Sequence, residues 1–492
     1  MSDFTTDYQK SVNRLDKDGQ KKALKTFHAA AERVPAYAHF LKHHGVNHKK
    51  IKSFEDFQKL PLVEKDNYLR KYPLHELMWD GQKFNGDIIS VSSGSSGEPY
   101  FWLRDQAQHE EAADIYYDIY KNTFNSDTVP TLLVVCFSMG IWIAGSYTTL
   151  GAMAANRKGL KMNVITPALD ISDSVAVIKR LQNDYQQIIL AGYPPFLKDL
   201  IDRGAEAGIN WLKLNVGFTA AGEAIGEELR EYFIKKGTKY NDPTKVISIY
   251  GTVDAGIVAN ESPLSITLRR LIYQNNLQED YFGRQVLPTL AQYDPLKKYI
   301  EVVDGNIVFS SSTALPLIRY NIKDVGGKFD DLSELIFNEK EFLRSIQKNN
   351  VDIKQWYRPF VYVHGRADFT ASLYAVLIYP ENIKKALLQE SLSKFTSGRF
   401  VMSIKHKKNL DQYLELVVEL RSDAKATKEL HNLIEKGVMN ILSQDNFEYR
   451  KLLNSIGRRA HPKVILKDAD DEQYFSRTSN KQRWTADALK NR

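Results

Sequence analysis

The stretch "QQIILAGYPPFLKDLIDRGAEAG", residues 186–208, decides the fold. Its first half is a short apolar run that ends in glycine and proline, which predicts a buried strand followed by a loop. Its second half places apolar residues at helical spacing, which predicts a helix. The same order recurs from "TLLVVCFSMGIWIAGSYTTLGAMAA" (131–155) to "VISIYGTVDAG" (246–256). Such alternation is typical of a largely parallel sheet with right-handed crossovers.

The predicted strands share one feature at their carboxyl ends, where each runs into a loop containing Gly, Ser, Thr or Pro. In open α/β sheets, ligands bind at the carboxyl ends of the strands. We therefore expect four loops to converge on one site: residues 92–97, 192–195, 219–223 and 250–256.

The pattern changes along the second half of the chain. Beyond residue 280 an alternating β pattern begins, with hairpin turns such as Asp304-Gly305. After "VYVHGRADF" (361–369) come a helix, two β stretches, a long helix and a basic tail. We predict an α/β fold with a large N-terminal domain, residues 1–365, that contains parallel-rich sheets and a small β subdomain. A smaller, mobile α+β domain is predicted for residues 366–492.

Composition excludes several classes of protein. The 492 residues are 43% hydrophobic and carry a net charge of +7, which is weak for a nucleic-acid binder. Cys136 is the only cysteine, so neither an intrachain disulfide nor a multi-cysteine zinc site is expected. His43, His44 and His48 lie among lysines, which favours a solvated surface turn over a metal site. We expect no membrane span, and a cytoplasmic protein is the simplest interpretation.

The loop in "VSSGSSGEPYFWLR" (91–104) is rich in serine and glycine. Successive small residues let backbone N–H groups point the same way and bind phosphate. The pattern of a Walker A loop is absent, and so is that of a serine-hydrolase elbow. Taken alone, the stretch fits a surface turn or a phosphate loop. The residues that would bind phosphate are Ser92, Ser93, Gly94, Ser95, Ser96 and Gly97.

Five later segments give this loop a context, because together they resemble the ordered motifs of the acyl-adenylate-forming enzymes. The N-terminal segment 35–72 is also similar to the opening of phenylacetate–CoA ligases. The resemblance covers nearly the whole chain. The five segments are "AAGEAIGEELREYF" (220–233), "IYGTVDAG" (249–256), "LPLIRYNIKDVG" (315–326), "HGRADF" (364–369) and "SRTSNKQR" (476–483).

The resemblance implies that a carboxylate and ATP form an acyl-adenylate and pyrophosphate. An anionic carboxylate must approach an anionic phosphate, so catalysis would depend on positioning and charge neutralisation. The 92–97 loop would hold the β- and γ-phosphates. Asp254 stands where the family has a glutamate that binds Mg²⁺. The nucleotide, with adenine between two loops, would be bound by Ala221, Gly222, Glu223, Tyr250, Gly251 and Thr252.

Four further positions take roles from the same resemblance. Asp324 would accept hydrogen bonds from the ribose hydroxyls, and Arg366 would support the ribose or the phosphates. Lys481 would reach the α-phosphate and the carboxylate oxygen, and Asp368 would be the hinge of the C-terminal domain. From the residues alone, Asp324 also fits a turn cap, and Lys481 fits one of many cations in a basic tail.

The sequence departs from the family pattern at several of these positions. Val253 replaces a hydroxyl residue, Asp254 is one methylene shorter than glutamate, and Asn480 replaces a glycine. Tyr374-Ala375 replaces an Arg-Gly pair in a segment that lines the CoA path in related ligases. The added methyl group weighs against CoA, so CoA, an amine and a carrier protein all stay open as the acyl acceptor.

Two segments occupy places that line the acyl pocket in related enzymes, and their side chains suggest an aromatic or apolar acid. Some of these side chains fit ordinary core equally well. The departures keep a second hypothesis open, namely a protein of the same fold that binds nucleotide without turnover. The candidate acid-binding residues are Phe137, Met139, Trp142 and Tyr193.

Overall fold

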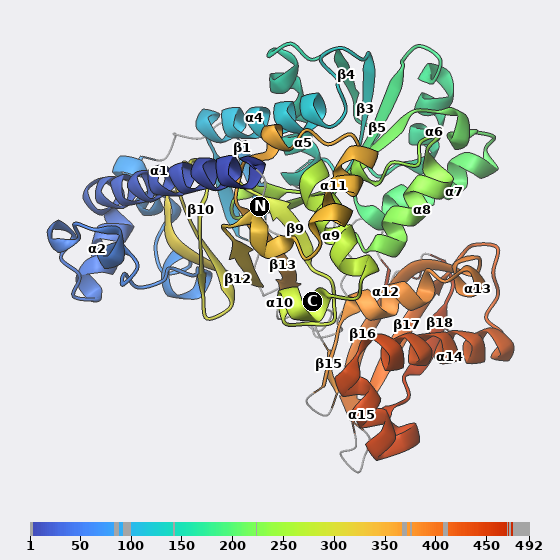
Figure 1. The fold of residues 1–492 in the computed structure, drawn as a ribbon. Coiled ribbons are helices and arrows are strands. Elements are labelled where there is room, and N and C mark those ends of the chain that lie inside the picture. The colour runs from blue at the N-terminus through green and yellow to red at the C-terminus, as the bar shows by residue number, and fades with distance from the viewer. Residues whose placement is uncertain are drawn as a thin grey trace.

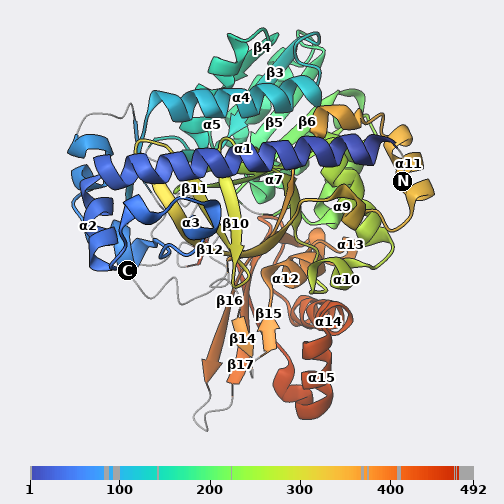
Figure 2. The same ribbon diagram turned by 60° about the vertical axis from the view of Figure 1, so that its left-hand side comes forward.

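A mixed sheet of eleven strands forms the centre of the protein, with the order β10-β11-β12-β13-β9-β8-β7-β6-β5-β3-β4. It carries helices on both faces, and a separate group of C-terminal elements lies at one end of the molecule (Figures 1 and 2). The computed structural model describes residues 3–82, 88–91, 100–140, 143–222, 224–366, 371–373, 376–406, 412–469, 471 and 474–475.

Five neighbouring strands of the sheet are parallel, as the alternating pattern predicted. Along β3, alternate side chains enter two different cores. Leu133 and Val135 pack beneath α4 and α5, whereas Leu132 and Val134 pack beneath α6, α7 and α8. The strands are β3 (Thr131–Cys136), β4 (Met162–Ile165), β5 (Gln187–Gly192), β6 (Val216–Ala221) and β7 (Val246–Thr252). The helices are α4 (Gln106–Asn122), α5 (Ile143–Asn156), α6 (Ile171–Leu181), α7 (Pro194–Glu206) and α8 (Glu227–Gly237).

The other six strands are antiparallel and continue the same sheet. The predicted β subdomain is therefore an extension of the parallel half rather than a separate sheet. The predicted Asp304-Gly305 turn joins β10 to β11, with φ values of 50° and 73°, which a two-residue hairpin turn requires. The strands are β8 (Gly256–Asn260), β9 (Thr289–Gln292), β10 (Tyr299–Val303), β11 (Asn306–Ser311), β12 (Leu317–Phe329) and β13 (Phe360–Arg366).

Residues 3–348 also supply the elements that surround this sheet. Helix α1 (Asp3–Arg33) crosses the width of the molecule below α4 in Figure 2. A short hairpin of β1 (Ile88–Val91) and β2 (Phe101–Arg104) flanks the predicted phosphate loop. The remaining helices are α2 (Pro35–His43), α3 (Phe54–Phe57), α9 (Pro263–Gln274), α10 (Gln278–Phe282) and α11 (Glu339–Lys348).

The C-terminal elements enclose a core of their own, built from residues between Ala371 and Leu466. The helix predicted over 381–394 is divided into α12 and α13, and the two β stretches and the long helix are present as predicted. The strands are β14 (Ala371–Leu373), β15 (Val376–Ile378), β16 (Thr396–His406), β17 (Gln412–Leu420) and β18 (Lys463–Lys467). The helices are α12 (Pro380–Leu387), α13 (Glu390–Ser393), α14 (Lys428–Asp445) and α15 (Phe447–Ile456).

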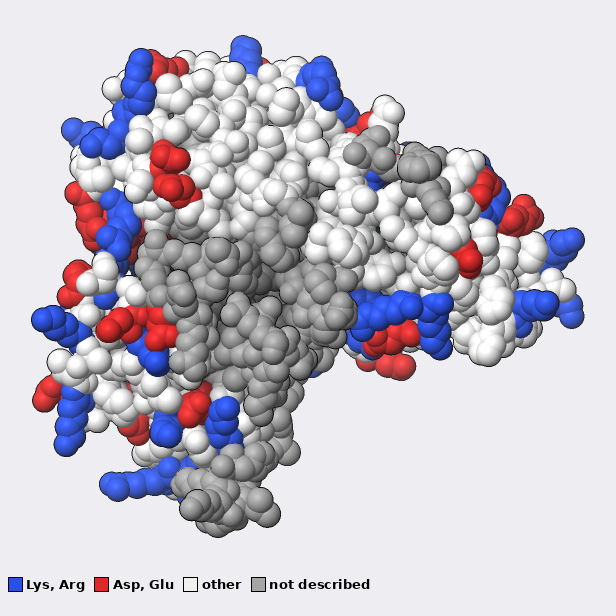
Figure 3. Space-filling view, turned by 180° about the vertical axis from the view of Figure 1, so that it is seen from behind, with Lys and Arg blue, Asp and Glu red and all other residues white. Residues whose placement is uncertain are grey.

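The surface agrees with a moderately charged protein. On the face drawn in Figure 3, acidic and basic side chains are interspersed around the edge. Among the described residues, no helix is both long enough and apolar enough to cross a bilayer.

Candidate functional site

Asp254 lies in the turn between β7 and β8, and its carboxylate is almost fully buried. The Tyr320 hydroxyl donates a hydrogen bond of 2.5 Å to Oδ2, and Lys65 Nζ lies 3.1 Å from Oδ1. Both oxygens of the predicted magnesium ligand therefore already have a protein partner in this conformation.

Lys65 reaches this position because its segment docks on β12. Val63 forms a bridge with Tyr320, and its backbone exchanges hydrogen bonds with Arg319 and Asn321 at 3.2 and 2.9 Å. Lys65 follows two residues later and lies over the Trp102 ring, 5.8 Å from its centroid. No motif in the sequence marks Lys65, so the structure adds one cation to the candidate site.

The predicted ribose-binding residue also meets a predicted nucleotide-binding residue. The Tyr250 hydroxyl, on β7, donates a hydrogen bond of 2.6 Å to Asp324 Oδ2, on β12. Asp324 is buried, and its backbone pairs with that of Arg366 on β13. An ionised carboxylate can accept several hydrogen bonds at once, which is the chemistry that binding of ribose hydroxyls requires.

The loops after β5 and β6 adjoin each other. Gly222 has a φ of 89°, and a Cβ atom placed there would lie 3.2 Å from the Tyr193 ring. Tyr193 is the N-cap residue of α7, immediately after β5. One loop predicted to bind adenine therefore lies against one predicted to bind the acid, as expected for neighbouring parallel strands.

Thr252 and Gly251, two other residues predicted to bind the nucleotide, shape the turn that carries Asp254. The Thr252 hydroxyl accepts a hydrogen bond of 3.1 Å from the Ala255 backbone N–H, and so closes the turn that carries Asp254. A Cβ atom at Gly251 would approach the Gly256 carbonyl oxygen to 3.3 Å, so the strand pair is tight at this point.

The predicted acid-binding residues are placed as follows. Phe137 is buried in the same hydrophobic cluster as Tyr147 and Ala221. The Met139 sulfur lies over Gly145 at the start of α5, because a Cβ atom there would be 2.5 Å from it. Several predicted site residues lie outside the described residues: Ser92, Ser93, Gly94, Ser95, Ser96, Gly97, Trp142, Glu223, Asp368 and Lys481.

One face of β2 covers the Asp254 turn. Residues 100, 102 and 104 alternate onto that face. Tyr100 and Trp102 have ring centroids 4.9 Å apart, and the Arg104 guanidinium donates a hydrogen bond to the Val253 carbonyl. Burial, together with the charge of Asp254, raises the pKa of the Tyr100 hydroxyl above its usual value. The Asp254 turn is therefore enclosed by aromatic rings and two cations.

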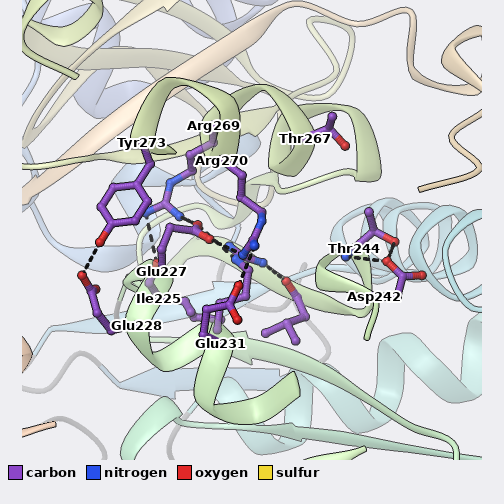
Figure 4. A network of polar contacts seen from close by, with 12 residues as sticks. Ile225, Glu227, Glu228, Glu231, Asp242, Thr244, Thr267, Arg269, Arg270 and Tyr273 are labelled. Atoms are coloured by element: carbon purple, nitrogen blue, oxygen red, sulfur yellow. Dashed lines mark hydrogen bonds and ion pairs between the residues drawn. The ribbon is translucent and has the colours of Figure 1, made fainter. Parts of the chain in front are cut away.

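A buried ionic network holds the surrounding strands (Figure 4). Arg230 binds Glu261 at 2.8 Å and Glu227 at 3.1 Å, and Arg269 also binds Glu227. Arg269 donates to the Ile225 carbonyl at 3.1 Å, in the loop that follows β6.

The same network reaches β7. Glu261 accepts a hydrogen bond of 2.9 Å from the Ser248 backbone N–H, and Arg230 donates to the Val246 carbonyl. The network therefore fixes both strands that lead to the predicted nucleotide-binding residues. The sequence alone does not indicate this network, because its charged residues lie on three separate elements.

The described side chains allow a test of the predicted magnesium site. No group of three or more His, Cys, Asp or Glu side chains is placed to hold a metal ion within the described ranges. Mg²⁺ at nucleotide sites usually takes one or two carboxylates, with phosphate oxygens and water as its other ligands. Asp254 fits as that one carboxylate, provided that Lys65 moves away from Oδ1.

Two sets of polar contacts join the C-terminal elements to the large sheet. Arg421, just after β17, binds Asp202 at 3.0 Å and Glu206 at 2.9 Å, both on α7. Lys385 on α12 lies 3.5 Å from Glu228 on α8. These contacts can form only in one relative placement of the two parts.

No protein-family model matches the chain, and neither does any curated protein. Solved structures do match. A 2-hydroxyisobutyryl-CoA ligase in the postadenylation state, in complex with 2-HIB-AMP, has a TM-score of 0.65 and 16% identity, and the match covers 96% of this chain and 89% of that one.

The same ligase was also solved in other states. An open conformation with 2-HIB-AMP and CoA has a TM-score of 0.53 and 15% identity, with 96% and 91% of the two chains covered. The thioesterification state has a TM-score of 0.52 and 16% identity, with 95% and 88% covered. The chain has the fold of the acyl-adenylate-forming ligases, which its ordered motifs predicted.

Proposed function

We propose that this protein activates a carboxylic acid with ATP, forms an acyl-adenylate and pyrophosphate, and passes the acyl group to an acceptor. One observation carries the proposal. Tyr193, Gly222 and Asp254 lie just after the carboxyl ends of the neighbouring parallel strands β5, β6 and β7, and Tyr250 near the end of β7 donates a hydrogen bond to Asp324 on β12. The fold that holds them is shared with a ligase whose structure contains an acyl-AMP.

The nucleotide is proposed to lie between the ends of β6 and β7. Asp324, held by Tyr250, accepts hydrogen bonds from the ribose hydroxyls, and adenine lies near Gly222. The positive φ of Gly222 allows the backbone to approach the base without a side chain in the way. The network of Arg230 and Glu261 keeps these strands in place before the nucleotide arrives, which lowers the entropic cost of binding.

Charge neutralisation is proposed to involve an exchange at Asp254. Lys65 pairs with Asp254 in the present conformation, and it turns to the phosphates when ATP binds. Asp254 is then free to hold Mg²⁺, which neutralises phosphate charge when it is bound. From the family resemblance alone, Lys481 is proposed to hold the α-phosphate beside the attacking carboxylate, and the 92–97 loop to hold the other phosphates.

The type of ligase, the acid, the acyl acceptor and the domain movement are proposals as well. The resemblance favours a phenylacetate–CoA ligase type of enzyme with an aromatic or apolar acid. Phe137, in one buried cluster with Tyr147 and Ala221, supports an apolar acid site beside the nucleotide. CoA, an amine and a carrier protein are the acceptors to compare. We also propose that residues 366–492 move as one domain about Asp368.

A second candidate function is nucleotide binding without turnover. It is favoured by one observation, namely that Lys65 and Tyr320 already occupy both oxygens of Asp254. If this pairing persists with ATP bound, Asp254 cannot hold Mg²⁺. Such a protein would bind ATP and release no pyrophosphate.

ATP–pyrophosphate exchange, measured with a panel of aromatic and aliphatic acids, separates the two functions. We expect exchange that depends on both an acid and Mg²⁺, and that is lost in Lys481→Ala and Asp254→Asn. Calorimetry should show that both variants still bind ATP. ATP binding by the wild type without exchange for any acid would instead establish the second candidate. Adding CoA, hydroxylamine or a carrier protein then identifies the acceptor.

A further inference from the structure

Arg104 is a buried cation that the proposed reaction does not use. Its side chain is 1% exposed, and burial lowers the pKa of its guanidinium. Among the residues that the structure describes, it makes one hydrogen bond, from Nη2 to the Val253 carbonyl, and its buried Nε has no acceptor there. Among the described residues, no carboxylate lies within ion-pair distance of it.

An arrangement of this kind is costly for a purely structural residue. A buried charge without a counter-ion destabilises a fold by several kcal/mol, and a buried N–H without an acceptor adds to that cost. Buried arginines elsewhere in this protein are paired, as Arg230 and Arg269 are with Glu227. Arg104 differs from them because, within the described part of the chain, no carboxylate pairs with it directly, and the charges of Asp254 and Asp105 oppose the lowering of its pKa only from beyond ion-pair distance.

The position of Arg104 follows from the β1–β2 hairpin. Val91 pairs with Phe101 at the end next to the predicted phosphate loop, and Ile88 pairs with Arg104 at the other end. Arg104 therefore lies about 10 Å further along β2 from the end next to that loop. Along the same face of β2, Trp102 lies beside Lys65, which pairs with Asp254. Counted from the end next to the predicted phosphate loop, β2 therefore presents Trp102 to this pair first and Arg104 after it.

Beyond the Asp254 turn, Arg104 meets the predicted acid-binding region. Its guanidinium lies 5.8 Å from the centroid of the Tyr147 ring, on α5. The Tyr147 hydroxyl is fixed by a hydrogen bond of 3.2 Å to the Gln108 carbonyl. Tyr147 shares a buried cluster with Phe137. Arg104 therefore lies between the Asp254 turn, through its hydrogen bond to Val253, and the Tyr147 side of the predicted acid-binding region.

We propose that Arg104 binds a second carboxylate, carried by the acid substrate at a distance from the carboxylate that is activated. This inference rests on the proposed function and narrows its substrate to an acid with an apolar or aromatic body and a second anionic group. The planar guanidinium offers a pair of parallel donors to a carboxylate. The ring of Tyr147 and the Phe137 cluster would contact the body of the acid.

The test compares matched acids in ATP–pyrophosphate exchange: benzoate with isophthalate, phenylacetate with 3-carboxyphenylacetate, and pentanoate with glutarate. The variants are Arg104→Met, Arg104→Lys and the control Arg33→Met. Arg33 also lies over an aromatic ring, that of Trp79, but is an exposed residue that pairs with Asp80. The wild type is expected to favour the dicarboxylate of at least one pair by about 10-fold or more in kcat/KM.

Arg104→Met is expected to lower kcat/KM for the favoured dicarboxylate by about 100-fold and to change that for its monocarboxylate partner by less than about 3-fold. The preference of Arg104→Lys for the dicarboxylate should lie between that of Arg104→Met and that of the wild type. The melting temperature of Arg104→Met should equal or exceed that of the wild type, because the variant removes an unpaired buried charge. Arg33→Met should leave the preference unchanged.

Three outcomes would overturn the inference. One is a wild type that favours the monocarboxylate of every pair. Another is an equal loss for both acids of a pair in Arg104→Met, which would mean that Arg104 holds the reacting carboxylate or the Val253 turn. The third is a lower melting temperature for both Arg104→Met and Arg104→Lys while both variants still favour the dicarboxylate, which would mean that Arg104 serves stability alone.

Calorimetry separates this inference from the proposed function. Isophthalate, 3-carboxyphenylacetate and glutarate are titrated into the wild type and into Arg104→Met, in the presence of ATP. Binding that needs Arg104, without exchange, would disprove the proposed reaction and leave the acid-binding role intact. Exchange with monocarboxylates alone, without Arg104-dependent binding of any dicarboxylate, would support the proposed reaction and disprove the acid-binding role of Arg104.

Discussion

Lys65, Asp254 and Tyr320 form the contact on which nucleotide binding depends in this account. A lysine and a tyrosine hold a carboxylate that Mg²⁺ would also bind, so the charges of Lys65 and Asp254 offset each other. In the proposed exchange, the lysine gains a phosphate partner when ATP enters, and the carboxylate becomes available to Mg²⁺. The same three residues would close the site in a protein that only binds nucleotide.

Lys65→Ala tests that exchange at the level of one residue. We expect kcat/KM for ATP in the exchange reaction to fall by about 100-fold, because a phosphate partner of full charge is lost. Lys71→Ala is the matched control, since Lys71 is exposed and follows in the same segment. Equal kinetics for the two variants would show that Lys65 has no part in the reaction.

At this scale the sequence predicted more of the nucleotide site than of its surroundings. Tyr250, Gly222, Asp254 and Asp324 were predicted because ordered motifs carry them, and their nucleotide-binding roles stay predictions. Lys65 was missed because nothing in the local spacing separates it from the other 66 Lys and Arg residues. Its place depends on the bridge between Val63 and Tyr320, which joins segments more than two hundred residues apart.

At the level of elements, the ionic network links α8, α9 and β7. Glu261→Gln is expected to lower the free energy of unfolding by about 3–5 kcal/mol, because Arg230 would stay buried with a weakened partner. It should also raise the KM for ATP, since the strand that carries Tyr250 loses its anchor. Urea unfolding and exchange kinetics measure the two effects.

Glu231→Gln provides the control for that prediction. Glu231 binds Arg270 at the edge of the same network, where its side chain is 35% exposed, and such a pair contributes about 0–1 kcal/mol. Similar losses for the two variants would contradict the view that burial makes the Glu261 pair important.

The order of helices and strands was largely predictable, because periodicity and turn residues are local properties. The alternating parallel half and the Asp304-Gly305 hairpin were predicted correctly. The join between the two halves was not predicted. The pairing of β9 with β13 makes one continuous sheet, and it depends on residues about seventy positions apart.

Asp199 lies on α7, near Glu419 of β17, and its titration makes the stability of the protein depend on pH. Burial, and then the charges of Asp202 and Glu419, raise the pKa of this carboxyl to about 6. The folded state therefore holds the proton more tightly than the unfolded state, whose carboxyl has a pKa of about 3.9. This stabilising contribution is complete below pH 4 and is lost as the pH rises through about 6.

Asp199→Asn should remove that dependence. At pH 7 the variant is expected to melt at least about 2 °C higher than the wild type, because it no longer carries a buried charge. The difference should shrink toward pH 4, where the wild-type carboxyl is protonated. Melting curves taken from pH 4 to pH 8 measure it. A difference that is constant over this range would show that Asp199 does not titrate there.

For the whole molecule, the contacts of Arg421 with Asp202 and Glu206 hold the C-terminal part in the present arrangement. If adenylation takes place in this arrangement, these contacts are needed for ATP–pyrophosphate exchange and not for acyl transfer. The sequence predicted a C-terminal domain from residue 366, and that boundary stays a prediction. The sequence did not indicate which charged residues would meet between α7 and the C-terminal part.

Arg421→Ala should shift the balance between arrangements. We expect exchange to slow by about 5–10-fold, because the population of the adenylating arrangement falls. Acyl transfer from synthetic acyl-AMP to the acceptor should be unchanged or faster. Arg458→Ala, a substitution of an exposed arginine in the same C-terminal part, is the control. Equal slowing of both half-reactions would contradict a role in domain placement.

The central claim is that one carboxylate oxygen of the acid becomes bonded to the α-phosphorus of ATP. The most direct test uses an acid labelled with ¹⁸O in its carboxylate, with hydroxylamine as the acyl acceptor. Mass spectrometry of the products should find AMP that carries one ¹⁸O atom, together with pyrophosphate and the hydroxamate. Hydroxamate accompanied by ADP and phosphate, or AMP without label, would contradict the account.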